Sequence, residues 1–169
     1  VTSGADLSIE FSNTIVMKTG EYQTIYAQWS GKQYTVTFDK NGGTGGIDSV
    51  TATMGQQLPA MSSSDLPTKP GYDFKGYQVY THPKDGYVHK YITYNGSPSS
   101  YWDIDQDYTV EAVWSPKEYK VTATAGTGVK SIYLASSMSA TSGKSSGSKF
   151  NYEYDVYCYA VLDRGYTRP

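Results

Sequence analysis

Three aspartates at alternate positions are the most distinctive chemical feature of this 169-residue chain. Asp103, Asp105 and Asp107 match the opening of a calcium-binding loop, in which alternate carboxylates bind the ion. Such a loop needs glycine near its sixth position and glutamate at its twelfth, and here those positions hold Tyr108 and Trp114. The row is therefore a calcium candidate, and the alternative is a charged row that faces solvent and discourages edge pairing of strands.

The two histidines of the chain, His82 and His89, flank an Asp85-Gly86 turn. Pairing in a hairpin could bring their rings together, but two histidines without a cysteine make a poor zinc site. The pattern favours histidines on the surface. Neither histidine has an obvious serine or cysteine with which it could form a nucleophile–base pair. We therefore expect no catalytic residue, no enzyme activity and no bound structural metal.

A single cysteine, Cys158, excludes a disulfide within the chain. It lies in the segment 150–162, where every second residue is apolar. This alternation predicts a small hydrophobic side chain on the buried face of a strand. No basic residue that would activate the thiol lies close to it in sequence. We expect Cys158 to be inert.

Tyrosine is unusually frequent, with 18 residues against 4 phenylalanines and 3 tryptophans. One aromatic group falls in the segment 87–102. Exposed rings there could stack on sugars or anchor a protein partner, and the alternative is that they pack the sheet. The candidate binding residues are Tyr87, Tyr91, Tyr94, Tyr101 and Trp102.

Charge and hydropathy exclude two classes of partner. The formal net charge is −2, so no electrostatic footprint for nucleic acid or an anionic membrane is present. Hydrophobic residues make up 38% of the chain, with no apolar run near the length of a membrane span. We expect no nucleic-acid partner, no membrane insertion of this segment and no cofactor.

Apolar residues alternate with polar ones along most of the chain, which predicts half-buried strands. Val36 and Phe38 share one face of a strand, and residues 41–46, rich in glycine, supply the turn that closes a first hairpin. The best helix candidate, 56–66, carries Pro59 and three serines and forms at most a turn or two. The fold class is therefore β-rich α+β with little helix. The predicted core residues are Tyr34, Val36, Phe38, Tyr72, Phe74, Ala112 and Trp114.

The chain also repeats itself. Residues 24–30 (TIYAQWS) return at 109–115 (TVEAVWS), an offset of 85 residues from 24 to 109. Residues 32–37 return at 117–122 with the same offset. A chain with a fixed period is an array of similar units. The expected units are the end of one repeat at 1–31, a complete repeat at 32–116 and the start of a divergent repeat at 117–169.

Four blocks in the complete unit carry a family resemblance: 34–43 (YTVTFDKNGG), 58–59 (LP), 67–77 (PTKPGYDFKGY) and 109–114 (TVEAVW). In order and spacing they resemble the Listeria–Bacteroides repeat, the family of the B-repeat of internalin B. The usual tryptophan after Gly76 is Tyr77 here. The resemblance implies tandem β-grasp-like beads, each a small mixed sheet with a short crossover, and no catalytic residue.

The resemblance also implies a place and a role. Proteins with this repeat are secreted or lie in the cell wall of bacteria, so we expect an extracellular, non-catalytic array that acts as stalk, spacer and adhesion scaffold. The alternatives are a module that binds a host or microbial glycan or protein through residues 87–102, or a filament subunit. In the array, neighbouring repeats complete the partial units 1–31 and 117–169. In the filament, chains complete each other head to tail.

Overall fold

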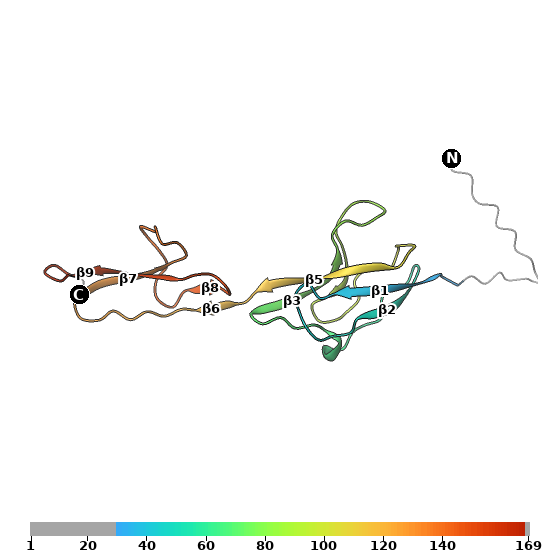
Figure 1. The fold of residues 1–169 in the computed structure, drawn as a ribbon, viewed down its shortest axis with the longest axis horizontal. Helices are drawn as coiled ribbons and strands as arrows, with labels where there is room; N and C mark the ends of the chain where they lie inside the picture. The colour runs from blue at the N-terminus through green and yellow to red at the C-terminus, as the bar shows by residue number, and fades with distance from the viewer. Residues whose placement is uncertain (1–29, 168–169) are drawn as a thin grey trace, which may run out of the picture. The chain divides into compact units, whose positions relative to one another are not determined.

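The computed structural model describes residues 30–167, which are almost entirely strands and loops (Figure 1). The strand-rich class expected from the sequence is confirmed. The predicted closing strand at 24–30 lies, except for Ser30, outside the described residues. None of the described residues lies in a helix with the length and hydrophobicity that crossing a bilayer requires. The strands are β1 (Gln33–Asp39), β2 (Ser49–Thr53), β3 (Tyr72–Val79), β4 (His89–Thr93), β5 (Tyr108–Pro116), β6 (Glu118–Lys120), β7 (Val129–Ala135), β8 (Lys149–Asn151) and β9 (Tyr157–Leu162).

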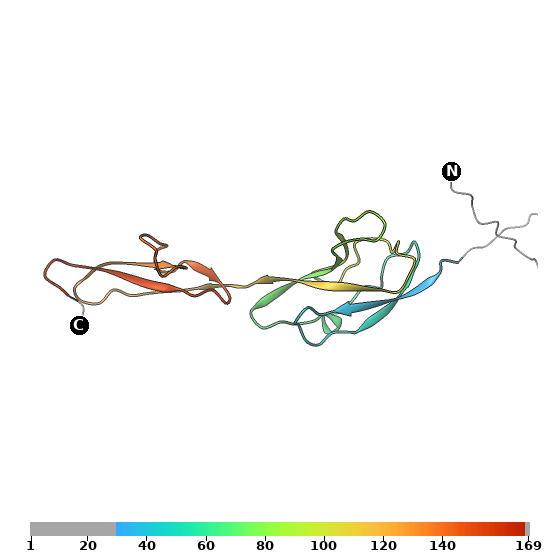
Figure 2. The same ribbon diagram turned by 45° about the horizontal axis from the view of Figure 1, so that its top comes forward.

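Strands β1 to β5 form one mixed sheet in the order β2-β1-β5-β3-β4 (Figure 2). The last strand in sequence, β5, is the central strand of this sheet. It runs parallel to β1, with Phe38 opposite Val110, and antiparallel to β3, with Tyr77 opposite Ala112. The helix candidate at 56–66 is reduced to a single 3-10 turn, η1 (Ser63–Asp65), in the connection between β2 and β3.

The glycine-rich turn after β1 is tied directly to β5. Asn41 takes a left-handed backbone conformation (φ 48°), and its side-chain amide donates to the carbonyl of Ala112 at 3.2 Å. The indole N–H of Trp114 donates to the carbonyl of Lys40 at 3.0 Å. A Cβ on Gly43 would lie 2.5 Å from the Trp114 ring, so only glycine fits there. This turn therefore closes the hairpin and also seats Trp114.

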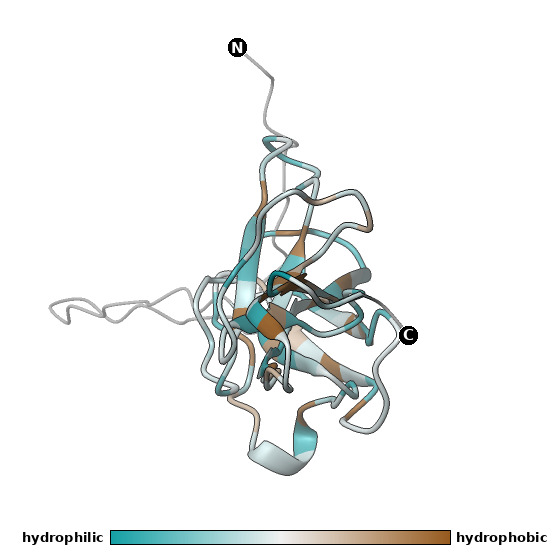
Figure 3. Cartoon of the chain, turned by 90° about the vertical axis from the view of Figure 1, so that its left-hand side faces the viewer, coloured by the Kyte–Doolittle hydropathy of each residue, from teal (hydrophilic) through white to brown (hydrophobic). Residues whose placement is uncertain are grey.

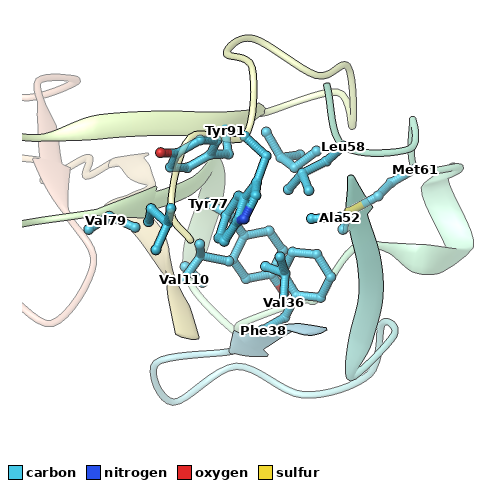
Figure 4. Close-up of a cluster of buried hydrophobic side chains, with 13 residues drawn as sticks. Val36, Phe38, Ala52, Leu58, Met61, Tyr77, Val79, Tyr91 and Val110 are labelled. Carbon is cyan, nitrogen blue, oxygen red and sulfur yellow. The ribbon is translucent and has the colours of Figure 1, made fainter. Parts of the chain in front are cut away.

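Side chains from all five strands and their connections fill one hydrophobic core against this sheet (Figure 4). Phe38 packs on Tyr77 with ring centroids 4.5 Å apart, and Phe74 lies 5.1 Å from Tyr77 and 5.5 Å from Trp114. Each such aromatic pair adds about 1 kcal/mol beyond the area it buries. The fully or nearly buried members are Val36, Phe38, Ala52, Leu58, Met61, Tyr77, Val79, Tyr91, Ile92, Trp102, Ile104, Val110 and Ala112.

Among the residues predicted for the core, Tyr72 is the exception. Val36, Phe38 and Ala112 are buried, and Tyr34, Phe74 and Trp114 are half-buried and pack against them. Tyr72 begins β3, opposite Pro116, where the sheet ends. Its ring meets Tyr152 edge-on at 5.6 Å instead of entering the core. Alternation predicted its face of the strand correctly but could not show what lies beyond the sheet's end.

After β5 the chain forms two further two-stranded sheets, β6 with β8 and β7 with β9, both antiparallel. Hydrophobic and hydrophilic residues follow one another along the strands (Figure 3).

The prediction that Cys158 is buried in β9 is wrong, because its side chain is exposed. Tyr159 stacks on Tyr133 at 4.9 Å and takes the more covered face of β9, so the adjacent Cys158 points the other way.

Tyr77 suggests a stabilising substitution. Its side chain is fully buried, and its hydroxyl has no hydrogen-bond partner in the described structure. An unpartnered buried hydroxyl costs on the order of 1 kcal/mol or more. We expect Tyr77→Phe to raise the free energy of unfolding by about 1 kcal/mol in urea denaturation. The matched control is Tyr91→Phe, which removes a bonded hydroxyl 2.9 Å from Asp103 and should lower that free energy instead.

The same hydroxyl should make the protein sensitive to alkali. Burial, followed by the charges of Asp39 and Asp48, raises the pKa of Tyr77 to about 12. The phenol of an unfolded chain ionises near pH 10, so the unfolded state gains stability between about pH 10 and 12 while the folded phenol stays neutral. Stability should fall across that window, and less steeply in Tyr77→Phe. A lower unfolding free energy for Tyr77→Phe at neutral pH would contradict the account.

Candidate functional site

A cluster of titratable side chains lies beside the connection between β3 and β4. We call it the His–Asp cluster: His82, Asp85, His89 and Asp103. Antiparallel pairing sets Val79 opposite His89, and the connection is closed by the amide of Gly86 on the carbonyl of His82 at 2.8 Å. The hairpin therefore brings the two histidines to the same place from seven residues apart in sequence.

The two imidazole rings are stacked, with centroids 4.1 Å apart and planes inclined by 16°. His82 is 1% exposed, so the expectation of a surface histidine is wrong for this residue. The hairpin folds His89 over one face of its ring, which sequence alone offered only as an alternative. His89 keeps about a quarter of its side chain accessible, at 27%.

Hydrogen bonds define the role of each ring nitrogen of His82. The backbone N–H of Lys84 donates to Nδ1 at 3.3 Å, so Nδ1 accepts. Nε2 lies 3.0 Å from Oδ1 of Asp103 and is then the donor. The hydroxyl of Tyr91 donates to the same oxygen at 2.9 Å. Burial, reinforced by this bond to Asp103, raises the pKa of the Tyr91 phenol, which stays a donor at physiological pH.

Asp85 holds the other histidine. Its Oδ2 lies 2.8 Å from Nε2 of His89, and its Oδ1 accepts the backbone N–H of Tyr87 at 2.9 Å. The bond from the Tyr87 amide is the main cause that lowers the pKa of Asp85, and His89 adds to it. Asp85 is therefore a carboxylate that fixes the His89 ring.

The cluster opens on a surface hollow of about 410 Å³, which His82 and Asp103 line together with Lys84, Ile104 and Asp105. His82, His89 and Asp103 each offer one ligand atom, and these atoms lie within 4.8 Å of one another. Two imidazole nitrogens and a carboxylate oxygen are groups that bind a transition metal or transfer a proton. The sequence did not predict this set, because the two histidines and Asp103 belong to separate motifs. The Asp-Gly turn between two histidines was the signal that could have joined them.

The aspartate row does not form a calcium loop. Asp103 is engaged by His82, while Oδ1 of Asp107 accepts the backbone N–H of Thr35 at 2.7 Å, at the start of the sheet. Asp105 is exposed to solvent. In the part of the chain that the structure describes, the carboxylates of the row do not converge as a ligand set. The calcium candidate is therefore not supported by the geometry.

The candidate aromatic group is divided by the fold. Tyr87, Tyr94 and Tyr101 are 73%, 68% and 66% exposed, so their rings are available to a ligand. Tyr91 and Trp102 are fully buried and pack on each other at 4.9 Å, so their assignment as binding residues is wrong. Trp102 follows the isolated bridge between Tyr101 and Gln57, and backbone bonds to Gln56 and Gly55 hold it where its ring enters the core.

Comparison with known families gives one match. Residues 34–81 match the family model of the Listeria-Bacteroides repeat domain, which confirms the resemblance over that span. The match indicates a repeat domain of the surface-protein type. It ends one residue before His82, so the His–Asp cluster and the exposed tyrosines at 87, 94 and 101 lie beyond it. Comparisons with curated proteins and with solved structures gave no match.

Proposed function

Taking residues 34–81 as a Listeria–Bacteroides repeat, we propose that the chain belongs to an extracellular repeat array of a bacterial surface protein. In this proposal it works as a spacer and adhesion scaffold, in the cell wall or secreted. The units are β-grasp-like beads, with the complete repeat at 32–116 flanked by parts of neighbouring repeats at 1–31 and 117–169. Repeat domains of this family are typically non-catalytic, and we propose no enzyme activity.

The observation that carries the spacer role is the short link after β5. Lys117 is the single residue between β5 and β6. Its backbone N–H donates to the carbonyl of Gly71 at 2.8 Å, and its carbonyl accepts the N–H of Tyr152 at 2.8 Å. The link is thus held from the complete repeat on one side and from the following segment on the other. A spacer needs links of this kind, because each free hinge shortens its mean reach.

Side chains reinforce the same link. The hydroxyl of Tyr72 donates to Oε2 of Glu153 at 2.7 Å, and the Tyr72 ring meets Tyr152 edge-on. This bond is the main cause that raises the pKa of Tyr72. Glu153 adopts a positive φ of 65°, a conformation that is costly for a residue with a side chain. The contact with Tyr72 contributes part of the interaction energy that offsets this strain.

A second candidate function rests on the exposed tyrosines. Tyr87, Tyr94 and Tyr101 expose most of their rings and lie outside the span that matches the family. Loops on a repeat scaffold are the usual place for binding specificity. Rings with a wet hydroxyl suit the faces of sugars or the core of a protein contact. The second proposal is therefore binding of a surface glycan or protein.

Adding one methyl group at Gly71 should loosen the link at Lys117. A Cβ on Gly71 would lie 2.2 Å from the Tyr152 ring, whereas a Cβ on Gly86, at nearly the same φ (78° against 77°), would meet nothing. Both alanine variants carry the same backbone strain, so Gly86→Ala is the matched control. By NMR relaxation, residues 32–116 and 117–167 of the wild type should tumble together. Gly71→Ala should let the second part move faster, and Gly86→Ala should not.

Independent tumbling of the two parts in the wild type would contradict the spacer proposal. So would a Gly71→Ala variant that tumbles as the wild type does, since the Gly71 contact would then carry none of the stiffness. Circular dichroism of both variants checks that any change reflects the link and not loss of the fold.

The binding proposal is tested on a glycan array and by capture of purified surface proteins. The full chain is compared with a variant that carries Tyr87→Ser, Tyr94→Ser and Tyr101→Ser. These exposed changes should leave stability within about 0.5 kcal/mol of wild type each. Binding by the wild type that the triple variant loses supports the proposal. A blank array, or binding that survives all three changes, contradicts it.

A further inference from the structure

The spacer function makes no use of the His–Asp cluster. In this cluster His82 is fully buried and bonded to the carboxylate of Asp103. We propose that the cluster binds one transition-metal ion of the zinc type, with His82, His89 and Asp103 as its protein ligands. This site is independent of the proposed spacer role. It also departs from the expectation, drawn from sequence, that the chain holds no structural metal.

The ligand types select the class of ion. Two imidazole nitrogens and one carboxylate oxygen suit Zn²⁺ and its neighbours, whereas Ca²⁺ requires six to eight oxygen ligands. Three protein ligands leave a fourth position to water on the side of the hollow. The local charge also favours a cation, since Asp85, Asp103 and Asp105 supply three carboxylates and Lys84 one ammonium.

One pair of ligand atoms already has the spacing of a bound site. Nε2 of His82 and Oδ1 of Asp103 are 3.0 Å apart, near the separation of about 3.3 Å between two ligand atoms on a tetrahedral zinc ion with bonds of about 2 Å. The ligand atom of His89 lies within 4.8 Å of both and must tilt inward from its stacked position. The tilt is a rotation of a side chain that is 27% accessible, with its Nε2 still held by Asp85.

Binding replaces a proton with a metal ion. The proton on Nε2 of His82, which now points at Asp103, would be released to solvent. The lone pair left on Nε2 would then bind the ion. Deprotonated ligands are needed, so affinity should fall as the solution is acidified.

Two neighbours act as positioning residues. The Tyr91 hydroxyl, 2.9 Å from Oδ1 of Asp103, orients that carboxylate. Asp85, 2.8 Å from Nε2 of His89, fixes the second ring. Carboxylates and hydroxyls that hold ligands in this way typically change metal affinity 10- to 100-fold when removed.

The test is a titration of the metal-free 169-residue chain with Zn²⁺ alone, followed by calorimetry and by thermal unfolding. The chain has only two histidines, so imidazole-dependent binding can come only from this cluster. We expect one Zn²⁺ per chain and a rise of several degrees in Tm at excess Zn²⁺. His89→Gln, at the more accessible position, should weaken binding at least tenfold. Asp155→Asn, which removes an exposed carboxylate outside the hollow, is the matched control and should bind as the wild type does.

Absence of a saturable Zn²⁺ site would overturn the proposal, as would equal affinity of the wild type and His89→Gln. A rise in Tm with Ca²⁺ but not with Zn²⁺ would also overturn it, because the ion would then bind oxygen ligands elsewhere. Circular dichroism of metal-free His89→Gln shows whether the variant is folded. If it is not, Co²⁺ absorption of the wild-type chain decides: visible bands typical of tetrahedral coordination support the site, and a spectrum of hydrated Co²⁺ contradicts it.

Discussion

Strand β5 lies between β1 and β3, and the rest of the five-stranded sheet depends on that placement. Along the chain, β1 pairs with β2 and β3 pairs with β4, each as an antiparallel hairpin. Neither can bury its apolar face alone, since an isolated two-stranded hairpin is at best marginally stable in water. With β5 between them, Val110 and Ala112 complete the core and the two hairpins are joined in one sheet.

The same strand organises the features at both ends of the sheet. At one end, Trp114 rests on the glycine-rich turn through its bond to Lys40. Directly after β5, Lys117 bonds to Gly71 and Tyr152, so the strand that completes the five-stranded sheet also begins the link to the next segment. The segment that leads into β5 supplies Asp103 to the His–Asp cluster, and Trp102 and Ile104 to the core. Stability, linkage and the candidate metal site thus share one stretch of chain.

Much of the sheet could be predicted from the sequence, because the alternation of apolar and polar residues along a strand is a local property. The faces of Val36 and Phe38 in β1 follow from it, and the turn after β1 follows from residues that tolerate a positive φ. Burial is different, since it depends on what covers a face. Alternation assigned Cys158 to a covered face and Tyr72 to the core, and the neighbouring segments that decide both are distant in sequence.

The candidate site shows the same limit. Sequence spacing suggested that His82 and His89 could meet, but Asp103 reaches them only because β3, β4 and the segment before β5 fold together. Likewise, Tyr101 and Trp102 look equivalent in sequence, and only the folded segment before β5 exposes the first and buries the second. A row of three aspartates was visible at once. Its first member proved to bond with histidine, and this depends on tertiary structure alone.

The central claim is that β5 is the last strand to be lost and that the hairpins do not persist without it. Native-state amide hydrogen exchange across a denaturant series measures this directly. The account predicts that amides of Val110 and Ala112 exchange only through global unfolding, together with those of Val36 and Tyr77, while amides in the edge strands β2 and β4 exchange through smaller openings. Faster exchange in β5 than in β1 or β3 would contradict the account, because the hairpins would then hold their structure without the strand between them.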